Sequence, residues 1–111
     1  MNIQIFGKKK CFDTGKAQRW FKERGIRFQY IDLSRDGISP GELKNVAAAL
    51  GGVRNMLDPE AKGDTAELVR YLSGDITGYL LEEPTLLKTP IVRNGRQATL
   101  GYQPDIWKNW T

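Results

Sequence analysis

The chain of 111 residues contains no histidine and a single cysteine, Cys11. Without imidazole groups it cannot assemble a zinc-type His/Cys cluster, or the Ser-His-Asp and Cys-His pairs of hydrolytic enzymes. One cysteine also excludes an internal disulfide. These absences exclude metal-dependent hydrolysis and protease chemistry. A lone free thiol fits a reducing compartment, so we expect the protein to be cytoplasmic.

Long apolar runs are absent as well. No stretch of 18 apolar residues is present, and the N-terminus lacks the pattern of a signal peptide, so we expect no membrane association. The net charge is +4, and the basic residues are scattered apart from Lys8 to Lys10, which favours a solvated surface over a nucleic-acid groove. Length and composition predict a single domain spanning residues 1–111.

The patterns that are present predict strands and helices in alternation. Strands are expected over about residues 2–6, 26–31, 90–93 and 97–100, and helices over about 14–24, 40–50, 64–73 and 75–82, with a short closing helix from Pro104. Ser39 and Glu42 form a capping-box signature before the helix 40–50. Asn94-Gly95 favours a type I′ hairpin turn. The order predicts an α/β fold, β-α-β followed by β-β-α, with a helical insertion over about 39–83.

Cys11 is predicted to lie where the first strand leads into the first helix. The unpaired N–H groups and the dipole of the helix stabilise a thiolate, and the run Lys8 to Lys10 adds positive charge. Cysteines in such settings have pKa values of roughly 3.5–7.5, against about 8.5 for a free cysteine. A lone cysteine can instead be an inert buried residue. The polar surroundings, bracketed by Gly7 and Gly15, favour the reactive thiol.

Three other features leave alternatives open. Asp13, beside the thiol, either orients a substrate or simply complements the helix dipole. The lysine run either attracts an anionic substrate or is a solvated surface. Trp107 and Trp110 either pack the last helix onto the sheet or mark a partner surface.

The order of elements and several segments resemble the thioredoxin-like fold, and more closely the arsenate reductase family, which includes the Spx transcription regulators. The matching segments are 5–7, 11–14, 16–21 with its Gly25 stop, 39–43, 83–92 and 101–105. They are spread along the chain in the family's order, so the likeness extends over nearly the whole chain.

The resemblance implies roles for individual residues. Cys11 matches the family's nucleophilic cysteine, and Thr14 matches a position that holds a hydroxyl residue in reductases and a second cysteine in redox-switch members. Pro90 matches a cis proline, so Thr89-Pro90 is expected to be a cis peptide facing Cys11. The expected substrate-binding residues are Lys10, Asp13, Thr14, Arg54, Thr89 and Pro90, and no metal site is expected.

The departures from the family pattern shape the functional expectation. Arsenate-reducing members carry three oxyanion-binding arginines where this chain has Asp58, Thr89 and Leu100, so we expect no arsenate reduction. Lys88, Arg93 or Arg96 would have to compensate from neighbouring positions. Because position 14 is threonine, an oxidised Cys11 needs a thiol from outside the chain.

The expected activity is therefore monothiol redox chemistry through Cys11 on an unidentified substrate. It would need no bound cofactor, and glutathione or a glutaredoxin-like protein would supply the second thiol. The alternative is a non-enzymatic, Spx-like interaction module that presents its inserted helices to a partner such as RNA polymerase, since a fold does not by itself confer the activity of its relatives.

Overall fold

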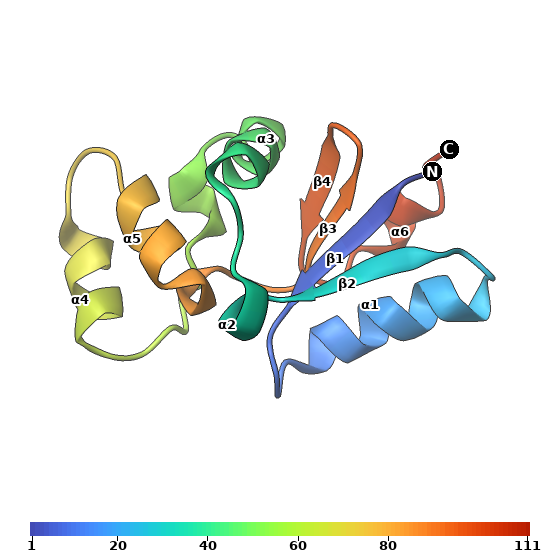
Figure 1. The fold of residues 1–111 in the computed structure, drawn as a ribbon, viewed down its shortest axis with the longest axis horizontal. Helices are drawn as coiled ribbons and strands as arrows, with labels where there is room; N and C mark the ends of the chain where they lie inside the picture. Colours follow the sequence, from blue (N-terminus) through green and yellow to red (C-terminus); the bar gives the residue numbers. More distant parts are fainter.

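Four strands form one mixed sheet in the computed structural model, which describes residues 1–111. The strands are β1 (Ile3–Gly7), β2 (Phe28–Asp32), β3 (Ile91–Asn94) and β4 (Gln97–Leu100), in the order β2-β1-β3-β4 (Figure 1). β2 is parallel to β1, whereas β3 is antiparallel to both β1 and β4. The predicted α/β class with a β-α-β and a β-β-α part is confirmed.

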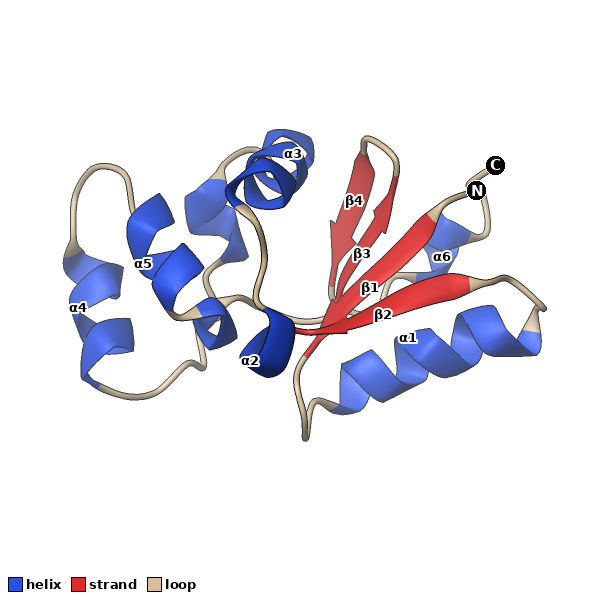
Figure 2. Ribbon diagram, viewed as in Figure 1, coloured by secondary structure: helices blue, strands red, loops and turns tan.

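Six helices and two short 3-10 turns complete the fold (Figure 2). The helices are α1 (Phe12–Glu23), α2 (Leu33–Asp36), α3 (Pro40–Leu50), α4 (Asp64–Tyr71), α5 (Thr77–Glu82) and α6 (Pro104–Trp107), and the turns are η1 (Val53–Met56) and η2 (Pro84–Leu86). All five predicted helices are present. No helix has both the length and the apolar character that a bilayer crossing needs.

The structure differs from the prediction at short elements. α1 begins at Phe12, two residues before the predicted start, and β2 is shifted to Phe28–Asp32. The unpredicted helix α2 follows β2 directly, because the Asp32 side chain accepts hydrogen bonds from the Ser34 backbone N–H and hydroxyl at 3.0 and 2.6 Å. Such Asx contacts start a single helical turn that carries no periodic hydrophobic signal.

The predicted start of α3 is confirmed. Ser39 Oγ accepts from the Glu42 backbone N–H at 3.1 Å, and Glu42 Oε1 accepts from the Ser39 backbone N–H at 3.0 Å. This reciprocal pair satisfies two helix-end donors and stabilises the helix by about 0.5–2 kcal/mol. α3 ends at Gly51, which adopts a φ of 84° that L side chains rarely take.

The prediction of a type I′ hairpin turn at Asn94-Gly95 was wrong. Asn94 is the last residue of β3 and lies opposite Gln97, so Gly95 and Arg96 are the two loop residues. Only Gly95 has a positive φ, 61°. Glycine at the first central position is the pattern of a type II′ turn, which keeps the strand twist as well as type I′ does.

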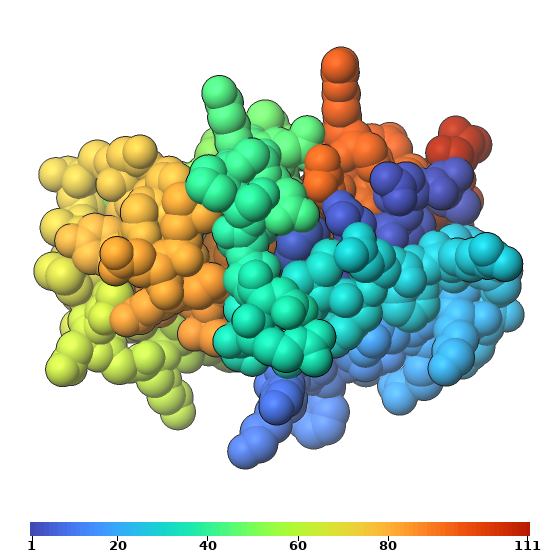
Figure 3. All heavy atoms as spheres, in the orientation of Figure 1, coloured from blue at the N-terminus to red at the C-terminus, as the bar shows by residue number.

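The two faces of the sheet are covered by different elements. α1 and α6 cover one face through Ile3, Ile5, Ala17, Trp20, Phe21, Val92, Trp107 and Trp110. The insertion packs on the other face, where Phe6 and Ile91 of the sheet join buried residues of α3, α4 and α5. In the space-filling view the insertion, green to orange, forms one end of a molecule that measures 41 × 27 × 23 Å (Figure 3).

Trp107 and Trp110 belong to the core beneath α1 and α6, so they pack the last helix onto the sheet and do not mark a partner surface. Trp107 is 2% exposed and Trp110 is 9% exposed. The Trp107 indole N–H donates to the Thr99 hydroxyl at 2.8 Å, and its ring packs edge-on against Trp20 at a centroid distance of 5.5 Å. Both tryptophans therefore fix the last helix to the sheet.

Candidate functional site

Cys11 lies between the end of β1 and the start of α1, as predicted, and occupies the N-cap position of that helix. Its sulfur faces Thr89, which lies two residues before β3. The Thr89 hydroxyl donates to Cys11 Sγ at 3.2 Å, and the thiol donates to the Thr89 carbonyl at 3.6 Å. Two segments that are 78 residues apart in sequence thus meet at the thiol.

The pKa of the Cys11 thiol is lowered from its ordinary value. Burial raises this pKa, but the Thr14 and Thr89 hydroxyls and the backbone N–H groups of Thr14 and Asp13, which are donors available to a thiolate, outweigh that effect. Donors of this kind stabilise the thiolate more than the neutral thiol. The lowering therefore comes from donors at the start of α1 and from Thr89, and the lysine run is not among its causes.

Thr14 supplies the most enclosed of these donors. Thr14 is only 3% exposed, and its Oγ1 has no hydrogen-bond partner in the structure, so this hydroxyl is free to donate to a thiolate. Gly7 makes room for it: a Cβ at position 7 would lie 2.3 Å from Thr14 Cγ2 and 2.9 Å from Tyr30 Cε1. Only glycine at the end of β1 allows this close approach.

A cleft of about 520 Å³ opens beside the thiol. It is lined by Lys8, Lys9, Lys10, Cys11, Phe12, Asp13, Asp58, Glu60, Lys88 and Thr89. Four of these side chains are lysines and three are carboxylates, so the cleft carries charges of both signs. The positive charge that the lysines bring to the cleft is thus largely balanced by acidic groups from α1 and from the insertion.

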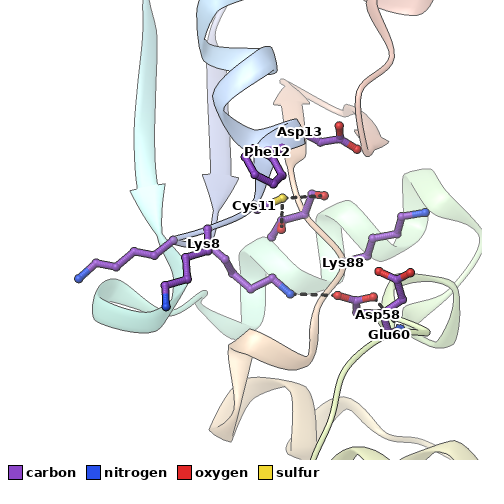
Figure 4. A pocket seen from close by; sticks show the side chains of 10 residues that line it. Lys8, Cys11, Phe12, Asp13, Asp58, Glu60 and Lys88 are labelled. Atoms are coloured by element: carbon purple, nitrogen blue, oxygen red, sulfur yellow. Dashed lines mark hydrogen bonds and ion pairs between the residues drawn. The ribbon is translucent and has the colours of Figure 1, made fainter.

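Asp58 compensates the charge of one of these lysines, Lys8. The Lys8 ammonium lies 3.2 Å from Asp58 Oδ2 and donates to the Thr85 carbonyl at 3.1 Å (Figure 4). The two side chains are only 18% and 21% exposed. Lys8 is therefore held against the insertion by two acceptors, which accounts for its absence from the hydrogen bonds around the thiol.

The predicted site residues on either side of Cys11 mostly gather around it. Lys10, Asp13 and Thr89 line the cleft, and Asp13 also lies in the first turn of α1, where its charge suits the helix dipole. Pro90 is buried beside them, and the Thr89-Pro90 peptide bond is cis, as the resemblance implied.

Comparisons with known proteins agree with this geometry. An arsenate reductase from Vibrio cholerae superimposes with a TM-score of 0.81 and 27% identity, covering 96% of this chain and 94% of that one. The resemblance to the arsenate reductase family is confirmed. No protein-family model matches the chain.

Two curated relatives are regulators. The global transcriptional regulator Spx 2 of Oceanobacillus iheyensis is 26% identical, with 95% of this chain and 80% of the relative covered. The regulatory protein MgsR of Bacillus subtilis is 23% identical, with 92% of this chain and 84% of the relative covered. The chain is therefore similar in sequence to regulators and in structure to a reductase.

Arg54, expected at the site from the resemblance to the arsenate reductase family, lies elsewhere. Its guanidinium donates to the Leu72 and Gly74 carbonyls at 2.7 and 3.1 Å, and more weakly to Val69 O at 3.4 Å. It does not line the cleft. Because these carbonyls close the end of α4, the structure gives Arg54 a structural role in the insertion.

The basic residues that were considered as replacements for the family's arginines also separate. Lys88 lines the cleft, but Arg93 donates to Gln4 Oε1 at 2.9 Å and to Gly95 O at 3.1 Å. Arg93 and Arg96 lie at the hairpin end of β3, where β1 begins, whereas Cys11 follows the end of β1. They are thus at the wrong end of the sheet to bind an anion beside the thiol.

Sequence reasoning missed several residues that face the thiol. Glu60 and the exposed Phe12 line the cleft, and no local pattern marked either of them. Burial and the charges of Asp32 and Cys11 raise the pKa of Tyr30, which indicates that this side chain also neighbours the thiol. Tyr30 of β2 pairs with Ile5 of β1, a neighbourhood that only the folded sheet reveals.

Proposed function

We propose that the protein carries out monothiol redox chemistry at Cys11, exchanging disulfides with a small thiol of the glutathione class. The observation that carries this proposal is the thiol itself: it lies at the start of a twelve-residue helix, accepts a hydrogen bond from Thr89 at 3.2 Å, has a lowered pKa and lines an open cleft. A thiolate in such a setting is the reactive form in disulfide exchange.

The proposed reaction has two balanced steps. The Cys11 thiolate attacks one sulfur of a disulfide, the disulfide's S–S bond breaks, and the departing thiolate takes a proton from water. A second thiolate then attacks the substrate-derived sulfur of the mixed disulfide: a new disulfide forms and departs, the S–S bond to Cys11 breaks, and the Cys11 thiolate is released for the next cycle. The second thiol must come from outside, since the chain has no other cysteine. Glutathione or a glutaredoxin-like protein fits this role without any bound cofactor.

The proposal predicts formation of a mixed disulfide on Cys11. The purified protein would be incubated with glutathione disulfide and analysed by intact mass, and the mixed-disulfide reductase activity would be measured with glutathione as donor. We expect one glutathione adduct on the native chain and none on Cys11→Ser. A native chain that forms no adduct at neutral pH, while its unfolded form does, would contradict the proposal.

Arsenate is not the proposed substrate. The site has Asp58 and Thr89 in place of two oxyanion-binding arginines, and a bidentate guanidinium contact contributes far more to anion binding than a hydroxyl does. We expect no arsenate turnover when glutathione and glutaredoxin are supplied, measured by coupled NADPH consumption. Turnover comparable with that of an arginine-bearing relative would show that Lys88 and the lysine run suffice.

A second candidate function has its own support. Both curated relatives are named as regulators, and the inserted helices expose Leu68, Tyr71 and Tyr79. A non-enzymatic, Spx-like module would use this surface to bind a partner, with RNA polymerase as the first to test. Co-purification with RNA polymerase that survives Cys11→Ser but is lost in Tyr71→Ala would favour this function. Either function is consistent with a cytoplasmic protein.

A further inference from the structure

The ion pair between Lys8 and Asp58 connects the thiol loop to the insertion. Lys8 comes from the segment between β1 and Cys11, and Asp58 follows η1. The lysine donates to Asp58 Oδ2 and to Thr85 O, while Asp58 Oδ1 accepts from the Glu60 backbone N–H at 2.9 Å. Both oxygens of the carboxylate are therefore engaged, and the pair is more enclosed than any other ion pair in the molecule.

The position of this pair matters for any charged substrate. Both residues line the cleft that opens beside Cys11. Without Asp58, Lys8 would face the cleft with its charge uncompensated. With Asp58, that charge is neutralised at a distance of 3.2 Å. Enclosed charges act on a ligand more strongly than exposed ones, because solvent and salt screen them less.

We propose that Asp58 determines the preference of Cys11 for disulfides of different charge. It neutralises Lys8, so the cleft does not select anions. This inference rests on the proposed function and deepens it. The preferred substrates are disulfides that are neutral or that carry both positive and negative charges, as disulfides of amino-acid-derived thiols do. Polyanionic disulfides are not favoured. Lys88 and Glu60, which carry opposite charges at the same cleft, are compatible with such a substrate.

The experiment compares three disulfides of different charge with the full-length protein. Dithiodipropionate carries negative charge, cystamine carries positive charge and hydroxyethyl disulfide is neutral. Second-order rate constants for mixed-disulfide formation on Cys11 would be measured by quenched mass spectrometry at low ionic strength. Dividing each rate by the rate with the neutral disulfide removes any change in the intrinsic reactivity of the thiol.

Two single variants should move the ratio of anionic to cationic rates in opposite directions. Asp58→Asn keeps the shape and the acceptor for Glu60 N–H but frees Lys8, so the ratio should rise roughly tenfold. Lys8→Gln leaves Asp58 unpaired, so the ratio should fall by a similar factor. The double variant should return the ratio to about the native value, within roughly twofold, because both charges are gone.

Glu60→Gln is the matched control, since it removes a carboxylate from the same cleft that pairs with no lysine. Its effect should be roughly threefold or less, because Glu60 is exposed and the high dielectric constant of water weakens its interaction with a ligand. Equal effects of Asp58→Asn and Glu60→Gln would overturn the inference, as net charge alone would then set the preference. An unchanged ratio in both single variants would also overturn it. If the native protein reacts with none of the three disulfides, the proposed function itself fails.

Discussion

Aromatic rings fill the face of the sheet that packs on α1 and α6, whereas mostly aliphatic side chains fill the face beneath the insertion. On the first face Trp20, Phe21 and Trp107 contact one another at centroid distances of 4.9 to 5.5 Å. Each such pair adds about 0.5–1.5 kcal/mol beyond its buried area. The aromatic face therefore makes a rigid base for β1 and α1, which together hold the thiol.

The two regions also contribute different groups to the site. The segment from β1 into α1 and the cis-proline segment before β3 supply Cys11, Thr14 and Thr89, which determine how readily the thiolate forms. The insertion supplies Asp58 and Glu60, which face an incoming substrate. Reactivity and selectivity thus come from separate parts of the chain, and variants in each part should affect one property and spare the other.

The largest expected effect is on the aromatic core. Trp107→Ala removes a ring that is 2% exposed, together with the hydrogen bond to Thr99, and should lower the free energy of unfolding by about 3–5 kcal/mol. Urea unfolding followed by circular dichroism measures this loss. Trp107→Phe, which keeps most of the ring, serves as the milder control. A loss below about 1 kcal/mol would contradict the role given to the aromatic face.

Truncation in the insertion should cost somewhat less. Leu80 of α5 is fully buried, and Leu80→Ala should lower the free energy of unfolding by about 2–5 kcal/mol. Because Phe6 and Ile91 of the sheet belong to the same core as Leu80, we expect one cooperative transition. Two separate transitions, seen by circular dichroism and tryptophan fluorescence, would show instead that the two regions unfold independently.

A smaller and more local effect is expected at Thr14. Thr14→Val keeps the shape of the side chain but removes the hydroxyl that stabilises the thiolate, so the pKa of Cys11 should rise. Thr14→Ser keeps the hydroxyl and should preserve the native pKa. The pH dependence of Cys11 alkylation measures both. Identical profiles for the valine and serine variants would exclude the hydroxyl as a donor to the sulfur.

Local signals predicted the elements and the position of the thiol. The capping box at Ser39 and the alternation around Ile5 depend on residues close in sequence, so single-sequence reasoning could find them. The short helix α2 and the turn at Gly95 were missed or misassigned because each depends on one side chain or one φ angle. The position of Thr89 came only from the family resemblance.

The charges of the cleft lay beyond local reasoning. Lys8 and Asp58 are 50 residues apart, and nothing in their neighbourhoods indicates that they pair. The lysine run was consequently interpreted as a source of positive potential at the thiol. Arg54 was assigned to the site by position in the family pattern, and only the carbonyls of Leu72 and Gly74 reveal what its guanidinium binds. Long-range partners of charged side chains are set by the tertiary fold.

The measurement that tests the central claim most directly is the titration of Cys11 in the native protein. Thiolate absorbance and the rate of iodoacetamide alkylation would be followed from acidic to alkaline pH, with Cys11→Ser as the blank. Because the folded state stabilises the thiolate through Thr14 and Thr89, we expect a midpoint below that of the unfolded chain, so that alkylation near neutral pH is faster in the folded protein. A folded-state midpoint at or above about 8.5, the value of a free cysteine, would contradict the activated thiol on which the account depends.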